Sequence, residues 1–173
     1  MKRVNVVGTS CSGKTTLARA VAHRMGVPHV ELDALYWSAG WTPVPDEVFR
    51  ERVEVAAAGE TWVIDGGYSP VRDITWQRVD TVVWLDYPMR TVLWRWARRT
   101  VRRMRTAEEF WPGTGNRESL GNALRRDGLL WWILRTHRPR RKRMAAQLAA
   151  RPDIAVVRLG SPSQADAWLR SLP

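Results

Sequence analysis

A short segment near the N-terminus, residues 4–21, restricts most strongly what this chain can fold into. It reads VNVVGTSCSGKTTLARAV, so an apolar run leads into a loop of small residues and then into a stretch with helical spacing. Gly8, four intervening residues, Gly13, Lys14 and Thr15 match the pattern G-x-x-x-x-G-K-[ST], with the required strand before the loop and helix after it. The segment therefore predicts a strand–loop–helix unit that binds phosphate through its backbone amides.

The loop residues have separate expected roles. Glycine allows the backbone angles that turn successive amides inward, and the positive end of the helix adds to the attraction for phosphate. Lys14 is expected to reach the β- and γ-phosphates of ATP, and the Thr15 hydroxyl to hold Mg²⁺. The alternative is a glycine-rich turn that caps a helix and leaves Lys14 in solvent. The predicted nucleotide-binding residues of the loop are Gly8, Ser10, Cys11, Ser12, Gly13, Lys14, Thr15 and Thr16.

Apolar runs alternate with amphipathic stretches along the rest of the chain. Short runs rich in Val and Ile, typical of strands covered on both faces, occur at 4–7, 30–32, 62–64, 82–85 and 154–159. Helical spacing occurs over 15–25, 46–58, 92–104 and 120–134. Pro139 is expected to open a further helix that runs through Leu148. The alternation predicts one three-layer α/β domain over residues 1–173, with a mainly parallel sheet and helices on both faces.

Positive charge is concentrated in one part of the chain. The formal net charge of the 173 residues is +11 at pH 7, and residues 90–143 hold 15 arginines and one lysine against four acidic residues. Such a localised excess indicates an anionic target, either a triphosphate or a polyanion such as nucleic acid. The sequence shows neither a secretory signal core nor an apolar run near the roughly 20 residues of a membrane span, so a cytoplasmic protein without a membrane partner is expected.

Three aspartates follow predicted strands and are candidates for metal and acceptor chemistry. They are Asp33 in HVELDALYW, Asp65 in WVIDGGY and Asp86 in VVWLDYP. Because the carboxyl ends of parallel strands meet at one sheet edge, all three are expected to gather there. Asp65 is predicted to bind Mg²⁺ through water, and Asp33 to serve the acceptor as a general base or binding group. The alternative for each is a carboxylate that caps the following turn, which is the favoured interpretation for Asp86.

The order of these segments resembles the topology modulation protein family, also called FlaR-like. The resemblance covers nearly the whole chain and is carried by the phosphate loop, ELDALYW, WVIDGGYSPVRD, VDTVVWLDYP and an arginine-dense segment ending in RTHRPRRKRM. Those proteins are similar to the adenylate kinase and shikimate kinase branch of P-loop NTPases. The resemblance implies a five-stranded parallel sheet in the order 2-3-1-4-5, ATP with Mg²⁺, an acceptor-side helical region over 33–60 and a mobile arginine-rich helical lid inserted over 100–126.

The resemblance also implies roles for two arginines. In nucleoside monophosphate kinases, the helix that enters the lid carries an arginine that stacks on adenine and another, one turn later, that clamps phosphate. Arg95 and Arg99 have this spacing and a matching distance from Asp86. A guanidinium group suits both tasks because it stacks flat and binds phosphate oxygens in pairs.

The acceptor side departs from the pattern of those kinases. Tyr36 and Ser69 stand where the kinases place two arginines that grip the acceptor phosphate. This difference argues against an ordinary nucleoside monophosphate as the acceptor, unless Arg72 or Arg78 substitutes for the missing pair.

Histidines and tryptophans give weaker indications. Three histidines lack metal-ligand spacing and are expected in solvent or packing roles, namely His23, His29 and His137. Trp131 and Trp132 lie beside arginines, as base-stacking residues would. Their helical spacing with Leu130 and Leu134 instead predicts core packing for Trp131.

Two functions remain open from the sequence. The first is a kinase-like phosphotransferase that uses ATP and Mg²⁺ on an unidentified small-molecule acceptor, with Lys14, Asp33, Asp65 and Arg99 as catalytic residues. The second is a nucleic-acid-associated nucleotide-binding protein or ATPase with a role in DNA topology, whose 90–143 region contacts nucleic-acid phosphates. The first is favoured because the sequence accounts for the whole active-site edge, whereas it contains no base-reading motif.

Overall fold

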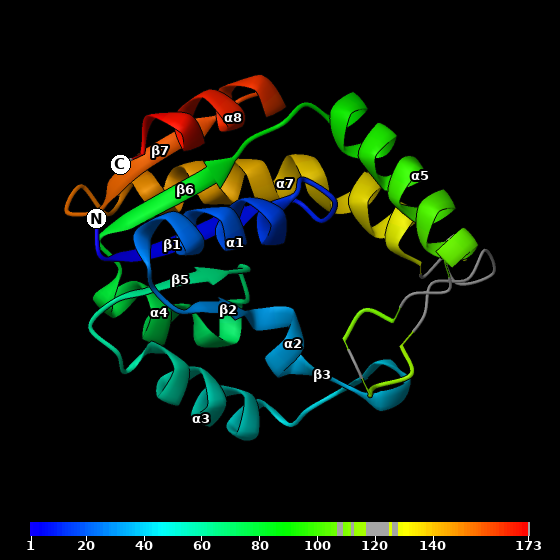
Figure 1. The fold of residues 1–173 in the computed structure, drawn as a ribbon, viewed down its shortest axis with the longest axis horizontal. Coiled ribbons are helices and arrows are strands. Elements are labelled where there is room, and N and C mark those ends of the chain that lie inside the picture. The colour runs from blue at the N-terminus through cyan, green and yellow to red at the C-terminus, as the bar shows by residue number, and fades with distance from the viewer. Residues whose placement is uncertain (107–108, 112, 117–124, 126–127, 173) are drawn as a thin grey trace.

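In the computed structural model, five parallel strands form a sheet with helices on both faces (Figure 1). The structure describes residues 1–106, 109–111, 113–116, 125 and 128–172. The sheet consists of β1 (Arg3–Gly8), β2 (His29–Glu31), β5 (Trp62–Asp65), β6 (Thr81–Leu85) and β7 (Ala155–Leu159). Neighbouring strands are parallel in the order β2-β5-β1-β6-β7. Counted along the chain this order is 2-3-1-4-5, so the predicted fold class is confirmed.

The first face of the sheet is covered by α1 (Lys14–Met25) and α8 (Pro162–Ser171), together with parts of α5 (Met89–Thr106) and α7 (Leu129–Ala149). Val4 and Val6 of β1 belong to the same buried cluster as Leu17 and Val21 of α1. Full burial of one such side chain stabilises the fold by about 1.5–3 kcal/mol. This packing fixes α1, and with it the loop that precedes the helix, against the sheet.

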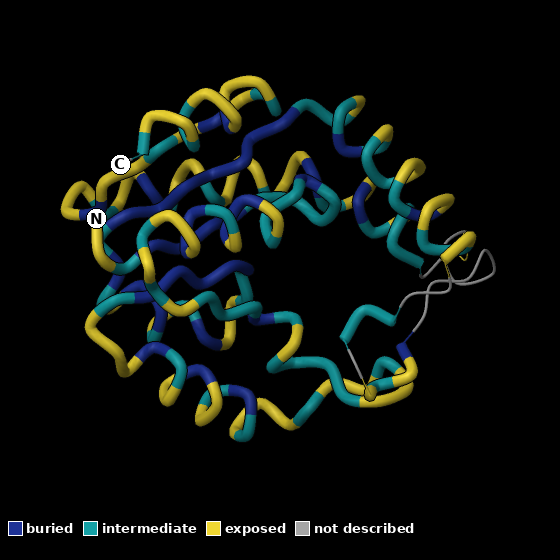
Figure 2. Tube along the Cα trace, viewed as in Figure 1, coloured by how far each residue is buried: buried dark blue, intermediate teal, exposed yellow. Residues whose placement is uncertain are grey.

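The second face is covered by α3 (Asp46–Ala57), α4 (Arg72–Arg78) and the C-terminal half of α7. Figure 2 shows that the strands of the sheet are mostly buried and that the helices are exposed on their outer sides. Along β1, Val7 joins this second cluster whereas Val6 joins the first, as the alternation of side chains along a strand requires.

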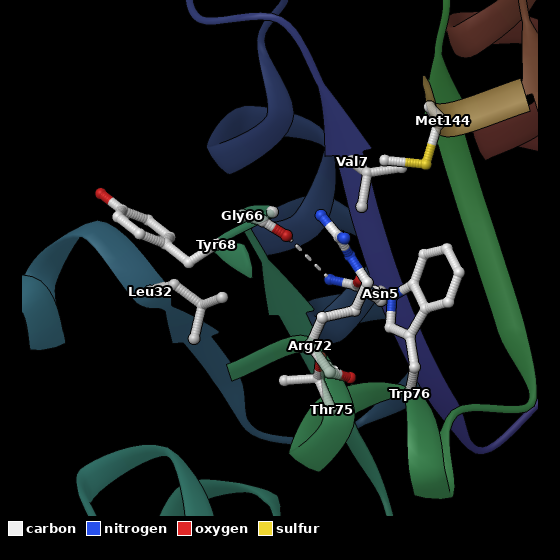
Figure 3. Close-up of a pocket in the computed structure, with 10 residues that line it drawn as sticks. Asn5, Val7, Leu32, Gly66, Tyr68, Arg72, Thr75, Trp76 and Met144 are labelled. Atoms are coloured by element: carbon white, nitrogen blue, oxygen red, sulfur yellow. Dashed lines mark hydrogen bonds between the residues drawn. The ribbon is translucent and has the colours of Figure 1, made fainter. Parts of the chain in front are cut away.

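A buried asparagine fastens the end of β5 to the centre of the sheet (Figure 3). Asn5 Nδ2 donates to the backbone oxygens of Ile64, at 3.0 Å, and Gly66, at 3.2 Å, and Asn5 Oδ1 accepts a 2.9 Å bond from Trp76 Nε1. All polar atoms of this buried amide are therefore hydrogen-bonded. The bonds hold the backbone on both sides of Asp65, the residue at which β5 ends.

A second, two-stranded antiparallel sheet follows the first β–α segment after α1. After β2 the chain forms α2 (Leu32–Tyr36), β3 (Trp37–Ser38), the 3₁₀ turn η1 (Ala39–Trp41) and β4 (Thr42–Pro43). Another 3₁₀ turn, η2 (Ser69–Val71), precedes α4. Within the described residues, none of the helices is long and apolar enough to cross a bilayer.

Pro139 does not open a separate helix, and that prediction is wrong. It lies inside α7, which is continuous from Leu129 to Ala149. Proline removes one helical hydrogen bond, the one that would reach the carbonyl of Arg135. Buried residues on both sides of the proline keep the two halves in one helix, because Ile133 packs in the first core cluster and Leu148 in the second.

Trp131 is also placed differently from the prediction. Its side chain is 39% exposed, and Trp132 is the residue that packs against the core. Each helical residue turns by about 100°, so Trp131 lies roughly 200° around α7 from the buried Ile133. Residues 120–124 and 126–127 of the predicted helix over 120–134 lie outside the described residues, as do Arg117 and Arg126, two of the arginines expected in the lid.

Candidate functional site

The loop between β1 and α1 adopts a conformation that requires glycine at two positions. Gly8 has φ 154°, and a Cβ atom there would lie 2.8 Å from the Leu85 carbonyl oxygen and 2.9 Å from Ser12 Oγ. Gly13 has φ 93° and precedes α1, and a Cβ atom there would collide with the guanidinium group of Arg95. Both glycines of the motif therefore serve the local backbone geometry.

The groups around this loop fit a bound phosphate. Ser12 Oγ is buried and has no hydrogen-bond partner in the described part of the chain, which leaves it available to an anion. Lys14 Nζ donates to the Thr9 carbonyl oxygen at 3.4 Å, so the ammonium group folds back over the loop. The first amides of α1 lack intrahelical acceptors, as at any helix N-terminus, and they add positive potential at the same place.

A threonine, an aspartate and a histidine meet at the carboxyl end of β5. Thr15 Oγ1 donates to Asp65 Oδ1 at 3.1 Å, and His29 Nε2 lies 2.7 Å from Asp65 Oδ2. The Asp65 carboxylate is buried. The two residues predicted for Mg²⁺ are therefore in contact, and their hydroxyl and carboxylate oxygens fit a Mg²⁺ ion held partly through water.

His29 is mostly buried, as a packing role would have it, and its imidazole also makes a polar contact with Asp65 that the sequence analysis did not expect. Its contact with Asp65 arises from the pairing of β2 with β5, in which Glu31 stands opposite Asp65 and His29 stands two residues earlier on the same face. No spacing in the sequence indicates this contact.

His137 is buried in α7, where its Nε2 lies 3.0 Å from the Tyr87 carbonyl oxygen.

Asp33 is paired with a tyrosine at the same edge of the sheet. The hydroxyl of Tyr68 donates to Asp33 Oδ1 at 2.6 Å. Burial and the neighbouring Asp33 carboxylate raise the pKa of Tyr68, so the phenol stays protonated and acts as a donor. Glu31 lies beside both Asp33 and Asp65, and burial together with these two carboxylates raises its pKa. Tyr68 and Glu31 are site residues that the sequence reasoning did not identify.

Asp86 has a different environment from the other two strand-end aspartates. Arg141 Nε lies 2.6 Å from its Oδ1, and Arg158 Nη2 lies 2.6 Å from its Oδ2. The carboxylate is only 4% exposed. Asp86 therefore ties α7 and β7 to the end of β6 through ion pairs, instead of capping the turn that follows.

Arg95 and Arg99 project from successive turns of α5. Arg95 Nη1 donates to the Ser12 carbonyl oxygen at 2.9 Å, and its guanidinium carbon lies 5.5 Å from the centroid of the Tyr87 ring. The guanidinium carbon of Arg99 lies 5.6 Å from the centroid of the Phe110 ring. Arg95 is thus at the phosphate loop, and Arg99 contacts the segment expected to form the lid.

Arg72 and Arg78, the two possible replacements for the missing acceptor arginines, are placed differently. Arg78 Nη1 donates to the carbonyl oxygens of Ala57 and Ala58, so it caps the C-terminus of α3 and lies away from the strand ends. Arg72 lines a narrow crevice, where its guanidinium group lies toward Asn5 and Gly66 (Figure 3). Gly67 and Tyr68 also line this crevice.

Arg140 of α7 contacts Gly67, one of the residues that line this crevice, and no feature of the sequence indicated this contact. Its Nη2 donates to the Gly67 carbonyl oxygen at 3.2 Å. Burial and the proximity of other arginines lower the pKa of both Arg72 and Arg140, with Arg143 acting on each. Among the described residues, no carboxylate forms an ion pair with any of these three arginines. Arg72, Arg140 and Arg143 are therefore close to one another and have no carboxylate ion-pair partner among the described residues, although the Asp33 carboxylate is near enough to Arg140 to offset part of the lowering of its pKa.

Residues 110–116, as far as they are described, are attached to the hairpin formed by β3 and β4. The buried Asn116 side chain accepts from the Trp41 amide at 2.9 Å and donates to the Ser38 carbonyl oxygen at 2.9 Å. The ring of Trp41 lies 4.7 Å from that of Phe110 and 5.9 Å from that of Trp111, between centroids. The described residues of the expected lid segment are thus joined to the hairpin that follows α2.

Comparison with known proteins shows the fold. No protein-family profile and no curated protein matches the chain. A sugar kinase from a Janibacter species has a TM-score of 0.55 at 22% identity, over 99% of this chain and 94% of that one. The shikimate kinase of Acinetobacter baumannii has 0.56 at 18%, over 98% and 89%, and that of Bacteroides thetaiotaomicron has 0.55 at 18%, over 99% and 96%. The chain therefore has the P-loop kinase fold. Its resemblance to the topology modulation family stays a prediction.

Proposed function

We propose that this protein is an ATP- and Mg²⁺-dependent phosphotransferase that acts on a hydroxyl group of a small-molecule acceptor. The observation that supports this most is the arrangement at one edge of the sheet. The phosphate loop and the Thr15–Asp65 pair lie on the nucleotide side, and the Asp33–Tyr68 pair lies on the acceptor side of the same edge. Ligands of open parallel sheets bind at this edge.

The nucleotide side is suited to hold a triphosphate. Lys14, Ser12 Oγ and the first amides of α1 would bind the phosphate oxygens, and Arg95 lies against the same loop. Thr15 would bind Mg²⁺ directly and Asp65 through water, and the bound ion would neutralise charge on the β- and γ-phosphates. Arg99 would contact the transferred phosphoryl group from the next turn of α5.

The acceptor side is suited to hold and deprotonate a hydroxyl group. Tyr68 occupies Asp33 Oδ1 and fixes the plane of the carboxylate, which leaves Oδ2 to accept from the acceptor hydroxyl. As the acceptor oxygen bonds to the γ-phosphorus and the bond to the bridging oxygen of ADP breaks, Asp33 takes the hydroxyl proton. Asp33 thus acts as the general base of the proposed transfer.

The arginines at the crevice indicate the charge of the acceptor. Arg72 and Arg140 flank Gly67 and Tyr68 and have no carboxylate partner among the described residues. Guanidinium groups bind carboxylate and phosphate oxygens in pairs, so an acceptor with such a group would relieve their repulsion. We infer that the acceptor is a hydroxy compound that carries an anionic group.

A screen of ATP consumption tests the proposal. Hydroxylated metabolites are offered in matched pairs with and without a carboxylate or phosphate, and single-stranded and duplex DNA are included. We expect ADP formation that depends on an anionic acceptor and that is lost in Lys14→Ala. Retained acceptor-dependent turnover in Lys14→Ala would reject the proposal. ATP consumption stimulated by DNA alone would favour the nucleic-acid function instead.

The inferred charge of the acceptor has its own control. Arg140→Ala should raise the acceptor KM by 10-fold or more while the KM for ATP stays within about twofold, because loss of a charge-assisted contact costs roughly 1.5–3 kcal/mol. Arg78→Ala is the matched control, because Arg78 caps the C-terminus of α3 and lies away from the site. This variant should leave the KM for the acceptor and the KM for ATP unchanged. Equal effects of the two substitutions would contradict a binding role for Arg140.

A further inference from the structure

His29 occupies an unusual position relative to the nucleotide side. It is the first residue of β2, the edge strand, and it is separated from the phosphate loop by β5. Its imidazole nevertheless reaches the buried Asp65 carboxylate, with 2.7 Å between Nε2 and Oδ2. The side chain of His29 is only 16% exposed and that of Asp65 only 2%. A contact this short and this buried orients both groups.

We propose that His29 is a positioning residue for the Mg²⁺ site, acting through the carboxylate of Asp65. This inference rests on the proposed function. His29 Nε2–H donates to Oδ2 and Thr15 Oγ1 donates to Oδ1, so the two oxygens of one carboxylate are held from two different elements. Because Oδ2 is occupied by His29, Oδ1 is the oxygen directed to Thr15 and to the metal's water.

Without His29 the carboxylate would be poorly fixed. The terminal torsion of an aspartate is broad, so one hydrogen bond does not define the plane of the carboxylate. The neighbouring Glu31 carboxylate repels that of Asp65 and favours a rotated group. The second bond from His29 opposes both effects. Residues that orient a metal-bound group in this way commonly change metal affinity by about 10–100-fold when they are replaced.

Two substitutions of His29 separate this role from simple packing. In His29→Gln the side-chain amide nitrogen can reach the place of Nε2, whereas in His29→Asn the amide lies one methylene shorter and cannot reach Asp65. Both variants are polar and similar in size, so they make a matched pair. The readout is binding of ATP to the full-length protein by calorimetry, first in EDTA and then at stepped Mg²⁺ concentrations, with thermal unfolding measured alongside.

We expect His29→Asn to raise the half-saturating Mg²⁺ concentration roughly tenfold, at the lower end of the range for such residues. ATP binding in EDTA should stay within about twofold of the wild type, and His29→Gln should recover most of the loss. The inference is overturned if wild-type binding of ATP depends on Mg²⁺ but His29→Asn leaves that dependence unchanged, or if both variants lose it equally. If the wild-type protein itself shows no Mg²⁺-dependent binding, the proposed function fails, and the role of His29 fails with it.

Discussion

The nucleotide side and the acceptor side of the candidate site are built in different ways. The nucleotide side comes mainly from one continuous segment, residues 8–16, and a single strand-end residue, Asp65. The acceptor side is assembled from α2, the turn after β5, α4 and α7, which contribute Asp33, Tyr68, Arg72 and Arg140. A site made from one segment is fixed by local geometry, whereas a site made from four depends on the whole fold.

Helix α5 and the expected lid segment that follows it also contact the two sides separately. Arg95 in the N-terminal half of α5 contacts the phosphate loop, but Asn116 and the rings of Phe110 and Trp111 contact the hairpin of β3 and β4. Residues 110–116 of the expected lid, as far as they are described, thus contact the hairpin on the proposed acceptor side. We expect changes on the nucleotide side to alter ATP affinity, and changes on the proposed acceptor side to alter kcat or the acceptor KM.

Asp33→Asn should have the largest effect on the acceptor side. The amide keeps the shape of the residue but cannot accept the proton of the acceptor hydroxyl, so kcat should fall by about 10²–10⁴-fold. Calorimetric ATP affinity should be unchanged, since Asp33 lies on the other side of the site. A variant that loses ATP affinity along with turnover would show that the two sides are not separate.

Asn116→Ala should have an intermediate effect. It removes two buried hydrogen bonds to the backbone of the hairpin and leaves the Trp41 amide and the Ser38 carbonyl unpaired. We expect the attachment of residues 110–116 to the hairpin to weaken by roughly 1–3 kcal/mol, because each unpaired buried group is costly. The acceptor KM should rise as a result. Fluorescence of the tryptophans in the cluster, compared with thermal unfolding of the whole chain, distinguishes local release from global destabilisation. An effect confined to the KM for ATP would assign the segment to the nucleotide side instead.

Glu31→Gln should have the smallest effect and a defined pH dependence. The raised pKa of Glu31 means that the folded state loses stability as the carboxyl ionises, between its ordinary value near 4.5 and the higher folded value. In EDTA, the variant should therefore be more stable than the wild type above this range, and the difference should vanish below it. Melting temperatures measured from acid to neutral pH provide the test. A variant that is less stable than the wild type at neutral pH would show that the charged form of Glu31 is well accommodated.

The strands of the sheet and most residues of the nucleotide side could be predicted from the sequence. The strands follow from the apolar runs, and the contact between Thr15 and Asp65 follows from a local motif and from the rule that strand ends meet at one edge, whereas the order of the five strands was implied by the family resemblance. His29 and Arg140 could not be found in this way, because their contacts depend on strand register and on which face of α7 meets the sheet. Pro139 was misread for a related reason, since packing on both sides of α7 outweighs the local preference of proline.

The central claim is that the loop between β1 and α1 binds a metal-bound triphosphate. Calorimetric titration of the folded wild-type protein with ATP, with and without Mg²⁺, tests it most directly, and Lys14→Ala serves as the control. The account predicts saturable binding that weakens strongly in EDTA and is lost in the variant, whose thermal unfolding is otherwise like that of the wild type. Absence of Mg²⁺-dependent binding by the folded wild-type protein would contradict the claim.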